Sequence, residues 1–172
     1  VMIISTNAGL WAYNIGDTVM FTSLKPYRII VSGRIKHFIS AFGEHVIGKE
    51  VEYALKETLQ VFPQVRVSEF TVAPQINPEA GLPYHEWFIE FENKPKDFSE
   101  FSKCIDESLQ KQNSYYFDLI EGKVLQPLKI SSLKKHAFQN YMKSQGKLGG
   151  QNKIPRLTND RTIANQLTKY LL

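Results

Sequence analysis

Residues 65–92 read VRVSEFTVAPQINPEAGLPYHEWFIEFE and decide the fold of this chain. Residues 65–73 and 84–92 are rich in β-branched and aromatic side chains, so they predict two strands. The prolines and the glycine of residues 74–83 predict a hairpin connection between them. The second strand alternates apolar and acidic side chains, which predicts one buried and one solvated face. The apolar side chains are Trp87, Ile89 and Phe91, and the acidic ones are Glu86, Glu90 and Glu92.

Helices are expected both before and after this hairpin in the sequence. Apolar residues at helical spacing predict a helix over 49–62 that Pro63 ends, and Asp97 is expected to cap a second helix that ends near Asn113. Further helices are predicted over 115–121, 132–144 and 162–171. Short β runs are expected within residues 1–31, where the pattern stops at Ser32–Arg34, and over 35–42 and 125–131. These elements predict an α+β fold with a mixed, mostly antiparallel sheet and packed helices.

Composition narrows the function classes. The chain has 172 residues, of which 42% are hydrophobic and 22% charged, as in ordinary globular proteins. No apolar run approaches the ~20 residues that cross a bilayer, so no membrane is expected. The single cysteine, Cys104, cannot form an internal disulfide, which predicts a reducing compartment, the cytoplasm. The four histidines lack metal-ligand spacing, so no metal site is predicted.

The charge is unevenly distributed along the chain. Residues 1–120 carry 11 basic and 15 acidic side chains, whereas residues 121–172 carry 10 basic and 2 acidic ones. A basic end of this kind permits a non-catalytic module that binds nucleic acid or an acidic partner. The basic residues form no run, and no recognition motif accompanies them, so nucleic acid is not expected as a partner.

Three segments carry residues suited to chemistry. In LWAYNIGD, residues 10–17, Asp17 could accept hydrogen bonds from a vicinal diol, although Gly-Asp between strands is also an ordinary turn. In VSGRIKHFI, residues 31–39, the Gly33-Arg34 pair and Lys36 suit a hinge, or else a solvated loop. The loop QGKLGGQNKIPR, residues 145–156, could bring a lysine to a phosphate or lie free on the surface.

Taken in order, the three segments resemble motifs of the auxin-responsive-promoter (Gretchen Hagen) family of acyl-acid amido synthetases. GLWAYNIGD, residues 9–17, resembles the family's G-L-Y-R-Y-R-x-G-D, with Ala12 and Asn14 where the family has arginine. GRIKHFI, residues 33–39, resembles the hinge motif of the adenylate-forming superfamily. GKLGGQNKIPRL, residues 146–157, resembles the family's closing segment, in which K-x-P-R corresponds to the superfamily's lysine motif.

The resemblance implies an ATP- and Mg²⁺-dependent ligase. Such an enzyme adenylates a carboxylic acid and then transfers the acyl group to an amine, usually of an amino acid. By resemblance, Asp17 holds the ribose hydroxyls with support from Arg34, and Tyr13 belongs to the same nucleotide-binding motif. Lys36 is the hinge, and Lys153 is the catalytic residue that meets the α-phosphate and carboxylate oxygens. Mg²⁺ is expected to bridge the phosphates.

The resemblance also implies a division of the chain. Residues 1–34 correspond to a β segment that ends a large N-terminal domain, and residues 35–172 to the mobile C-terminal lid domain. Because Val1 begins inside an apolar run, we expect a piece of a longer enzyme that is inactive without its N-terminal domain. The competing enzyme hypothesis is an acyl-CoA ligase, which shares the hinge and lysine motifs but transfers to a thiol.

Overall fold

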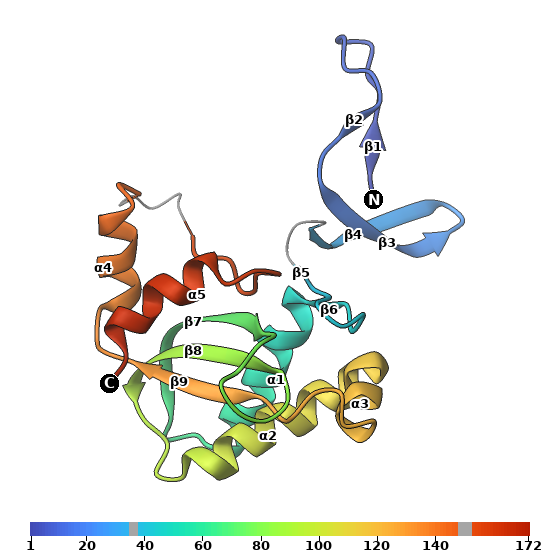
Figure 1. The fold of residues 1–172 in the computed structure, drawn as a ribbon. Coiled ribbons are helices and arrows are strands. Elements are labelled where there is room, and N and C mark those ends of the chain that lie inside the picture. Colours follow the sequence, from blue (N-terminus) through green and yellow to red (C-terminus); the bar gives the residue numbers. More distant parts are fainter. Residues whose placement is uncertain (35–37, 148–152) are drawn as a thin grey trace.

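The computed structural model describes residues 1–34, 38–147 and 153–172, and a three-stranded sheet lies at the centre of its body (Figure 1). The strand order is β7 (Arg66–Gln75), β8 (Tyr84–Asn93) and β9 (Lys129–Leu133). β7 and β8 pair antiparallel, which confirms the predicted hairpin. β9 is parallel to β8, because two helices connect them and return the chain to the end of the sheet at which β8 begins. The sheet is therefore mixed, and the α+β prediction is confirmed.

One face of the sheet packs against three helices, α1 (Gly48–Val61), α2 (Phe98–Gln112) and α3 (Ser114–Glu121). The core between them includes the fully buried Trp87 and Phe101. α2 begins as predicted, since the Asp97 carboxylate accepts hydrogen bonds from the first free backbone N–H groups at 2.8 and 3.0 Å. The helix predicted over 49–62 is also confirmed, within one residue at each end.

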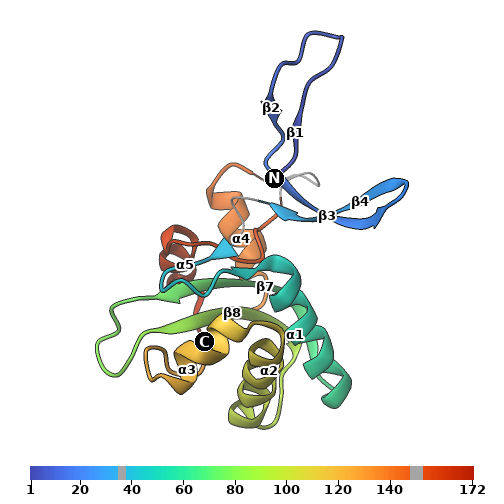
Figure 2. The same ribbon diagram turned by 90° about the vertical axis from the view of Figure 1, so that its right-hand side faces the viewer.

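The opposite face is covered too, so the predicted solvated side is wrong. α4 (Ala137–Ser144), α5 (Thr162–Leu167) and the short 3₁₀ helix η1 (Thr168–Tyr170) lie over it and form a second core with Phe88. Figures 1 and 2 show α4 and α5 on the side of the sheet away from α1 and α2. Glu86 and Glu90 are only 8% and 6% exposed under this layer.

These two carboxylates are buried because both have tertiary partners. Glu86 pairs with Arg161 at 2.7 Å, and Glu90 accepts from the backbone N–H groups of His136 and Phe138 at 2.7 and 3.2 Å. Full pairing is what makes a buried charge tolerable. The contact of Glu90 also caps α4, which starts at Ala137; the predicted start at Ser132 is wrong, because Ser132 pairs within β9.

The N-terminal part forms three two-stranded antiparallel ladders. These are β1 (Ile3–Ile4) with β2 (Tyr13–Asn14), β3 (Asp17–Leu24) with β4 (Tyr27–Arg34), and β5 (Phe38–Ile39) with β6 (Val46–Ile47). The prediction that Ser32–Arg34 break the strand is wrong, because a register shift lets β4 stay paired to its end. In Figures 1 and 2, β1 to β4 extend away from the body.

Each edge strand of the central sheet forms one isolated β-bridge with the C-terminal part of the chain. Leu157 pairs in parallel with Val72 of β7, and Leu171 pairs antiparallel with Leu133 of β9. Each bridge covers part of an edge strand and so shortens the open edge that could pair with other chains. Among the described residues, no helix has the length and apolarity needed to cross a membrane.

Candidate functional site

The segment after the glycine-rich loop is fastened to the edge of β7. The Val72 N–H donates to the Arg156 carbonyl, and the Thr158 N–H donates to the Val72 carbonyl, both at 2.9 Å. The Thr71 hydroxyl donates to the Pro155 carbonyl at 2.7 Å. Residues 155–158 therefore lie beside β7 as a short additional strand.

Side chains of the same segment enter both cores. Ile154 is 8% exposed and packs in the second core with Phe138, whereas Leu157 is fully buried in the first core with Trp87. The segment thus crosses the sheet edge with one apolar side chain on each face. Lys153 directly precedes Ile154 and is exposed. Its backbone is consequently held on one side while its side chain is free to reach outward.

Lys153 lines a pocket of about 370 Å³ between the edge of β7 and α4. Lys147, the other lysine of the glycine-rich loop, lines the same pocket with His136 and Gln139. Its backbone N–H donates to the Met142 carbonyl at 3.0 Å, so α4 holds it. The structure therefore brings both lysines of the loop to one cavity.

Two carboxylates in this pocket are already paired. Glu90 caps α4, and Glu69 pairs with Arg156, which also contacts Glu52 at 2.9 Å and lies 4.8 Å from the ring of Phe70. The backbone bonds leave the charge of Glu90 in place, so side chains of both charges line the pocket, with Lys147 and Lys153 as its lysine groups. The two lysines are the groups of this cavity that could bind an anion.

The residues predicted to hold a nucleotide lie on the N-terminal ladders. Asp17 and Arg34 are register partners at the open end of β3 and β4, so the two predicted partners are neighbours. Asp17 is half-buried, and Tyr13 on β2 is 53% exposed. Lys36 and residues 148–152 of the loop lie outside the described residues, so the structure gives no position for the expected hinge residue.

A second pocket, also of about 370 Å³, lies where β4 meets the body. Val31, Ser32 and Gly33 of β4 line it together with Glu52 of α1 and Arg156. Arg156 therefore stands between the Lys153 segment and the end of the β3–β4 ladder. This arrangement places Arg156 of the lysine motif and Gly33 of β4 in the lining of one pocket.

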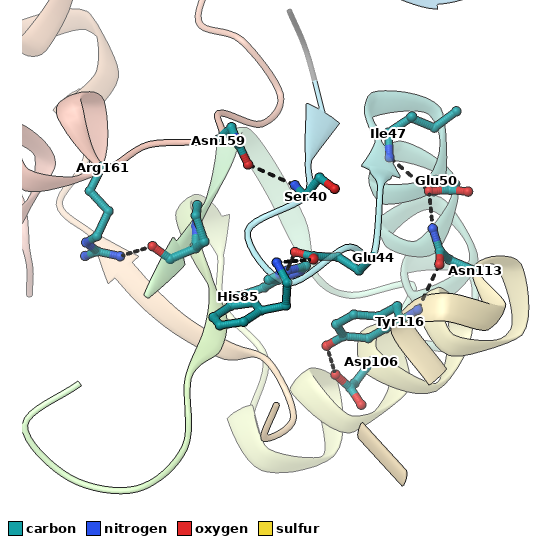
Figure 3. A network of polar contacts seen from close by, with 12 residues as sticks. Ser40, Glu44, Ile47, Glu50, His85, Asp106, Asn113, Tyr116, Asn159 and Arg161 are labelled. Carbon is teal, nitrogen blue, oxygen red and sulfur yellow. Dashed lines mark hydrogen bonds and ion pairs between the residues drawn. The ribbon is translucent and has the colours of Figure 1, made fainter. Parts of the chain in front are cut away.

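A buried polar network on the face that α1, α2 and α3 cover lines neither of these two pockets (Figure 3). His85 donates to Glu44 at 2.9 Å with both side chains fully buried, and the Tyr116 hydroxyl donates to Asp106 at 2.6 Å. Burial raises the pKa of Glu44, but hydrogen bonds from His85 and from backbone N–H groups outweigh it, so this pKa lies below its ordinary 4.5. Burial, then the Asp106 charge, raises the pKa of Tyr116 well above its ordinary 10.0. The network joins the loop of Glu44 to β8 through His85, and joins α3 to α2 through Tyr116 and Asp106.

Sequence reasoning missed the residues that support Lys153. Thr71 gave no signal, because a threonine inside a strand is an ordinary β-former. For Glu90, the alternation of apolar and acidic side chains along its strand predicts a solvated side chain. A signal for Glu90 existed in the need of α4 for a cap, since the side chain of its N-cap residue, His136, makes no cap hydrogen bond. No described group of three His, Cys, Asp or Glu residues could hold a metal ion.

Comparison with known proteins gives a family match and two similar structures. The model of the GH3 family C-terminal domain matches residues 49–162. A GH3.15 acyl acid amido synthetase is similar in fold with a TM-score of 0.78 at 20% identity. An AtGH3.15 acyl acid amido synthetase in complex with 2,4-DB has a TM-score of 0.73 at 18% identity. Each similarity covers 99% of this chain and 32% of the other. The chain therefore spans about a third of these proteins, and no curated protein matches it.

Proposed function

Because this chain belongs to the GH3 family, whose C-terminal domain matches residues 49–162, we propose that it is part of an ATP-dependent acyl-acid amido synthetase. The proposed enzyme joins a carboxylic acid to the α-phosphate of ATP and releases pyrophosphate. An amine, such as that of an amino acid, then attacks the acyl-adenylate and forms an amide. The synthetase names of the two similar structures support this reaction class.

The observation that carries the proposal is the anchored position of Lys153. Its segment is bonded to β7 and inserts into both cores, while the lysine itself lines a pocket that Lys147 also lines. A charge held in place before the reaction stabilises a transition state better than one that must be ordered during it. Lys153 is therefore the proposed catalytic residue, opposite the negative charge that develops between carboxylate and α-phosphate.

Nucleotide contacts are proposed on the N-terminal ladders. Asp17 would accept hydrogen bonds from the ribose hydroxyls, with Arg34 beside it and Tyr13 on the neighbouring ladder. Lys36 would be the hinge between residues 1–34, which end the large domain, and residues 35–172. Exposed apolar side chains of the N-terminal part, Trp11 at 87% between β1 and β2 and Tyr27 at 77% on β4, favour a covering N-terminal domain.

Mg²⁺ has no site among the described residues that three acidic or imidazole side chains could form. The described residues do not fit a protein-held Mg²⁺, and a role of the ion beside ATP stays a prediction. Cytoplasmic location likewise remains a prediction from the single cysteine.

Pyrophosphate exchange into ATP tests the proposal. The 172-residue chain should give none, because the proposed acid and phosphate sites lie in the N-terminal domain. In the complete enzyme, Lys153→Ala should lower exchange by ~100-fold or more, the loss typical of one preorganised charge. Lys147→Ala, in the same pocket, is the matched control and should cost much less. The opposite order would give the catalytic role to Lys147, and acyl transfer to coenzyme A but not to amines would establish the acyl-CoA ligase.

A further inference from the structure

We infer that Thr71 is a positioning residue for Lys153: its hydroxyl holds the Pro155 carbonyl and thereby fixes where the lysine segment leaves the sheet. The inference rests on the proposed role of Lys153 in adenylation. It adds a residue outside the three sequence motifs, 82 positions before the lysine. Thr71 itself touches no reacting group, and its effect passes through the backbone of residues 153–155.

The environment of Thr71 favours an apolar side chain over a hydroxyl. Thr71 lies in the middle of β7 and is 1% exposed. Neighbouring side chains of a strand point to opposite faces, so Thr71 shares its face with Ala73, which packs in the second core with Ile154. A buried hydroxyl is tolerated there because it donates to the Pro155 carbonyl at 2.7 Å. Valine would fill the same volume without that bond.

The contact uses the one backbone group that Pro155 can offer to a hydrogen bond. Pro155 lacks an amide hydrogen, so only its carbonyl can take part, and that carbonyl accepts from Thr71. The backbone bonds of the added strand involve the Arg156 carbonyl and the Thr158 N–H. The Thr71 hydroxyl therefore makes the hydrogen bond nearest to Lys153 on the anchored side.

The alternative anchor is weaker. Arg156 pairs with Glu52 and Glu69, but the three side chains are 37%, 55% and 32% exposed, so water and salt screen these charges. A buried hydrogen bond is screened much less. Thr71 is consequently the better candidate for holding the lysine segment at a defined place.

Thr71→Val tests this inference by removing only the hydroxyl. The matched control is Thr58→Val, since Thr58 is also fully buried and its hydroxyl donates to the Ala54 carbonyl at 2.9 Å, inside α1 and away from the loop. In the 172-residue chain, hydrogen exchange of the Thr158 amide should accelerate about 3–10-fold in Thr71→Val and not in Thr58→Val, in line with one neutral hydrogen bond. Equal exchange in both variants would overturn the inference.

The complete enzyme gives the second readout. Thr71→Val should lower kcat for pyrophosphate exchange about 3–10-fold with an unchanged KM for ATP, and Thr71→Ser should restore it because serine keeps the donor. If Thr71→Val does not fold, the Thr71→Ser and Thr71→Ala pair isolates the hydroxyl instead. An unchanged kcat in the variants that lack the hydroxyl, in an enzyme that Lys153→Ala impairs, overturns the inference alone. An unimpaired Lys153→Ala enzyme overturns the proposed role of Lys153, and the hydrogen-exchange result then still reports whether Thr71 holds the segment.

Discussion

Replacing Glu90 by glutamine should destabilise the chain strongly. The carboxylate accepts two backbone N–H groups, from His136 and Phe138, and is 6% exposed. Glutamine keeps one acceptor oxygen and turns an N–H₂ group toward a backbone N–H, so one hydrogen bond to a charged group is lost and one donor is left unpaired. Bonds of this kind contribute about 1.5–3 kcal/mol, and the negative charge at the start of α4 adds some tenths more. We expect the free energy of unfolding to fall by about 2–4 kcal/mol.

Urea unfolding followed by circular dichroism measures this loss. With a slope near 2 kcal/mol per molar, the midpoint should shift by about 1–2 M urea. Glu92→Gln is the matched control, because Glu92 follows the same alternation on β8 but is exposed. That variant should stay within ~0.5 kcal/mol of the unmodified chain. Equal midpoints for the two variants would refute the buried cap and restore the solvated face that the alternation predicts.

Three further predictions concern the nucleotide site, the hinge and the buried network. In the complete enzyme, Asp17→Ala should weaken ATP binding by roughly 1.5–3 kcal/mol, as measured by calorimetry, and an unchanged affinity would return Asp17 to a simple turn. Lys36→Pro, which fixes φ near −65°, should change the rates of adenylation and amide formation unequally; equal losses in both would remove the hinge assignment. Because the pKa of Glu44 lies below its ordinary 4.5, its contribution to folding stability is present above that value and is lost as pH falls through the folded pKa. Stability should therefore fall more between about pH 6 and pH 3 in the unmodified chain than in Glu44→Gln, and equal slopes would contradict the assignment.

Local signals in the sequence were enough for the elements of the first face. Residues 65–92 carry both strands and their connection, and Pro63 ends α1. Asp97 caps α2 by accepting hydrogen bonds from the residues two and three positions later. Every one of these signals acts within a few positions of the chain. Such contacts can be predicted because the physical cause and its effect lie in the same short window.

The second face required contacts between distant residues. Glu90 meets its donors 46 and 48 positions later, and Glu86 meets Arg161 75 positions later. An alternating strand with acidic residues has the same pattern whether water or a helix N-terminus receives the carboxylates. The anchoring of Lys153 was predictable only in part: Pro155 indicates an extended segment, but the hydroxyl that holds it lies 84 positions earlier.

The two layers of the domain differ in how their buried carboxylates bear on the proposed catalytic lysine. Lys153 adjoins Ile154, which packs in the same core as Phe138, the second residue of the helix that Glu90 caps. Glu44 and His85 belong to the opposite side and reach neither residue. Loss of the Glu90 cap should therefore lower stability and also shift the residues of α4 that line the Lys153 pocket. Loss of the Glu44–His85 contact should lower stability and leave the pocket in place. The acidic stripe of β8 thus links to the lysine through α4, which is why its burial bears on the site as well as on the fold.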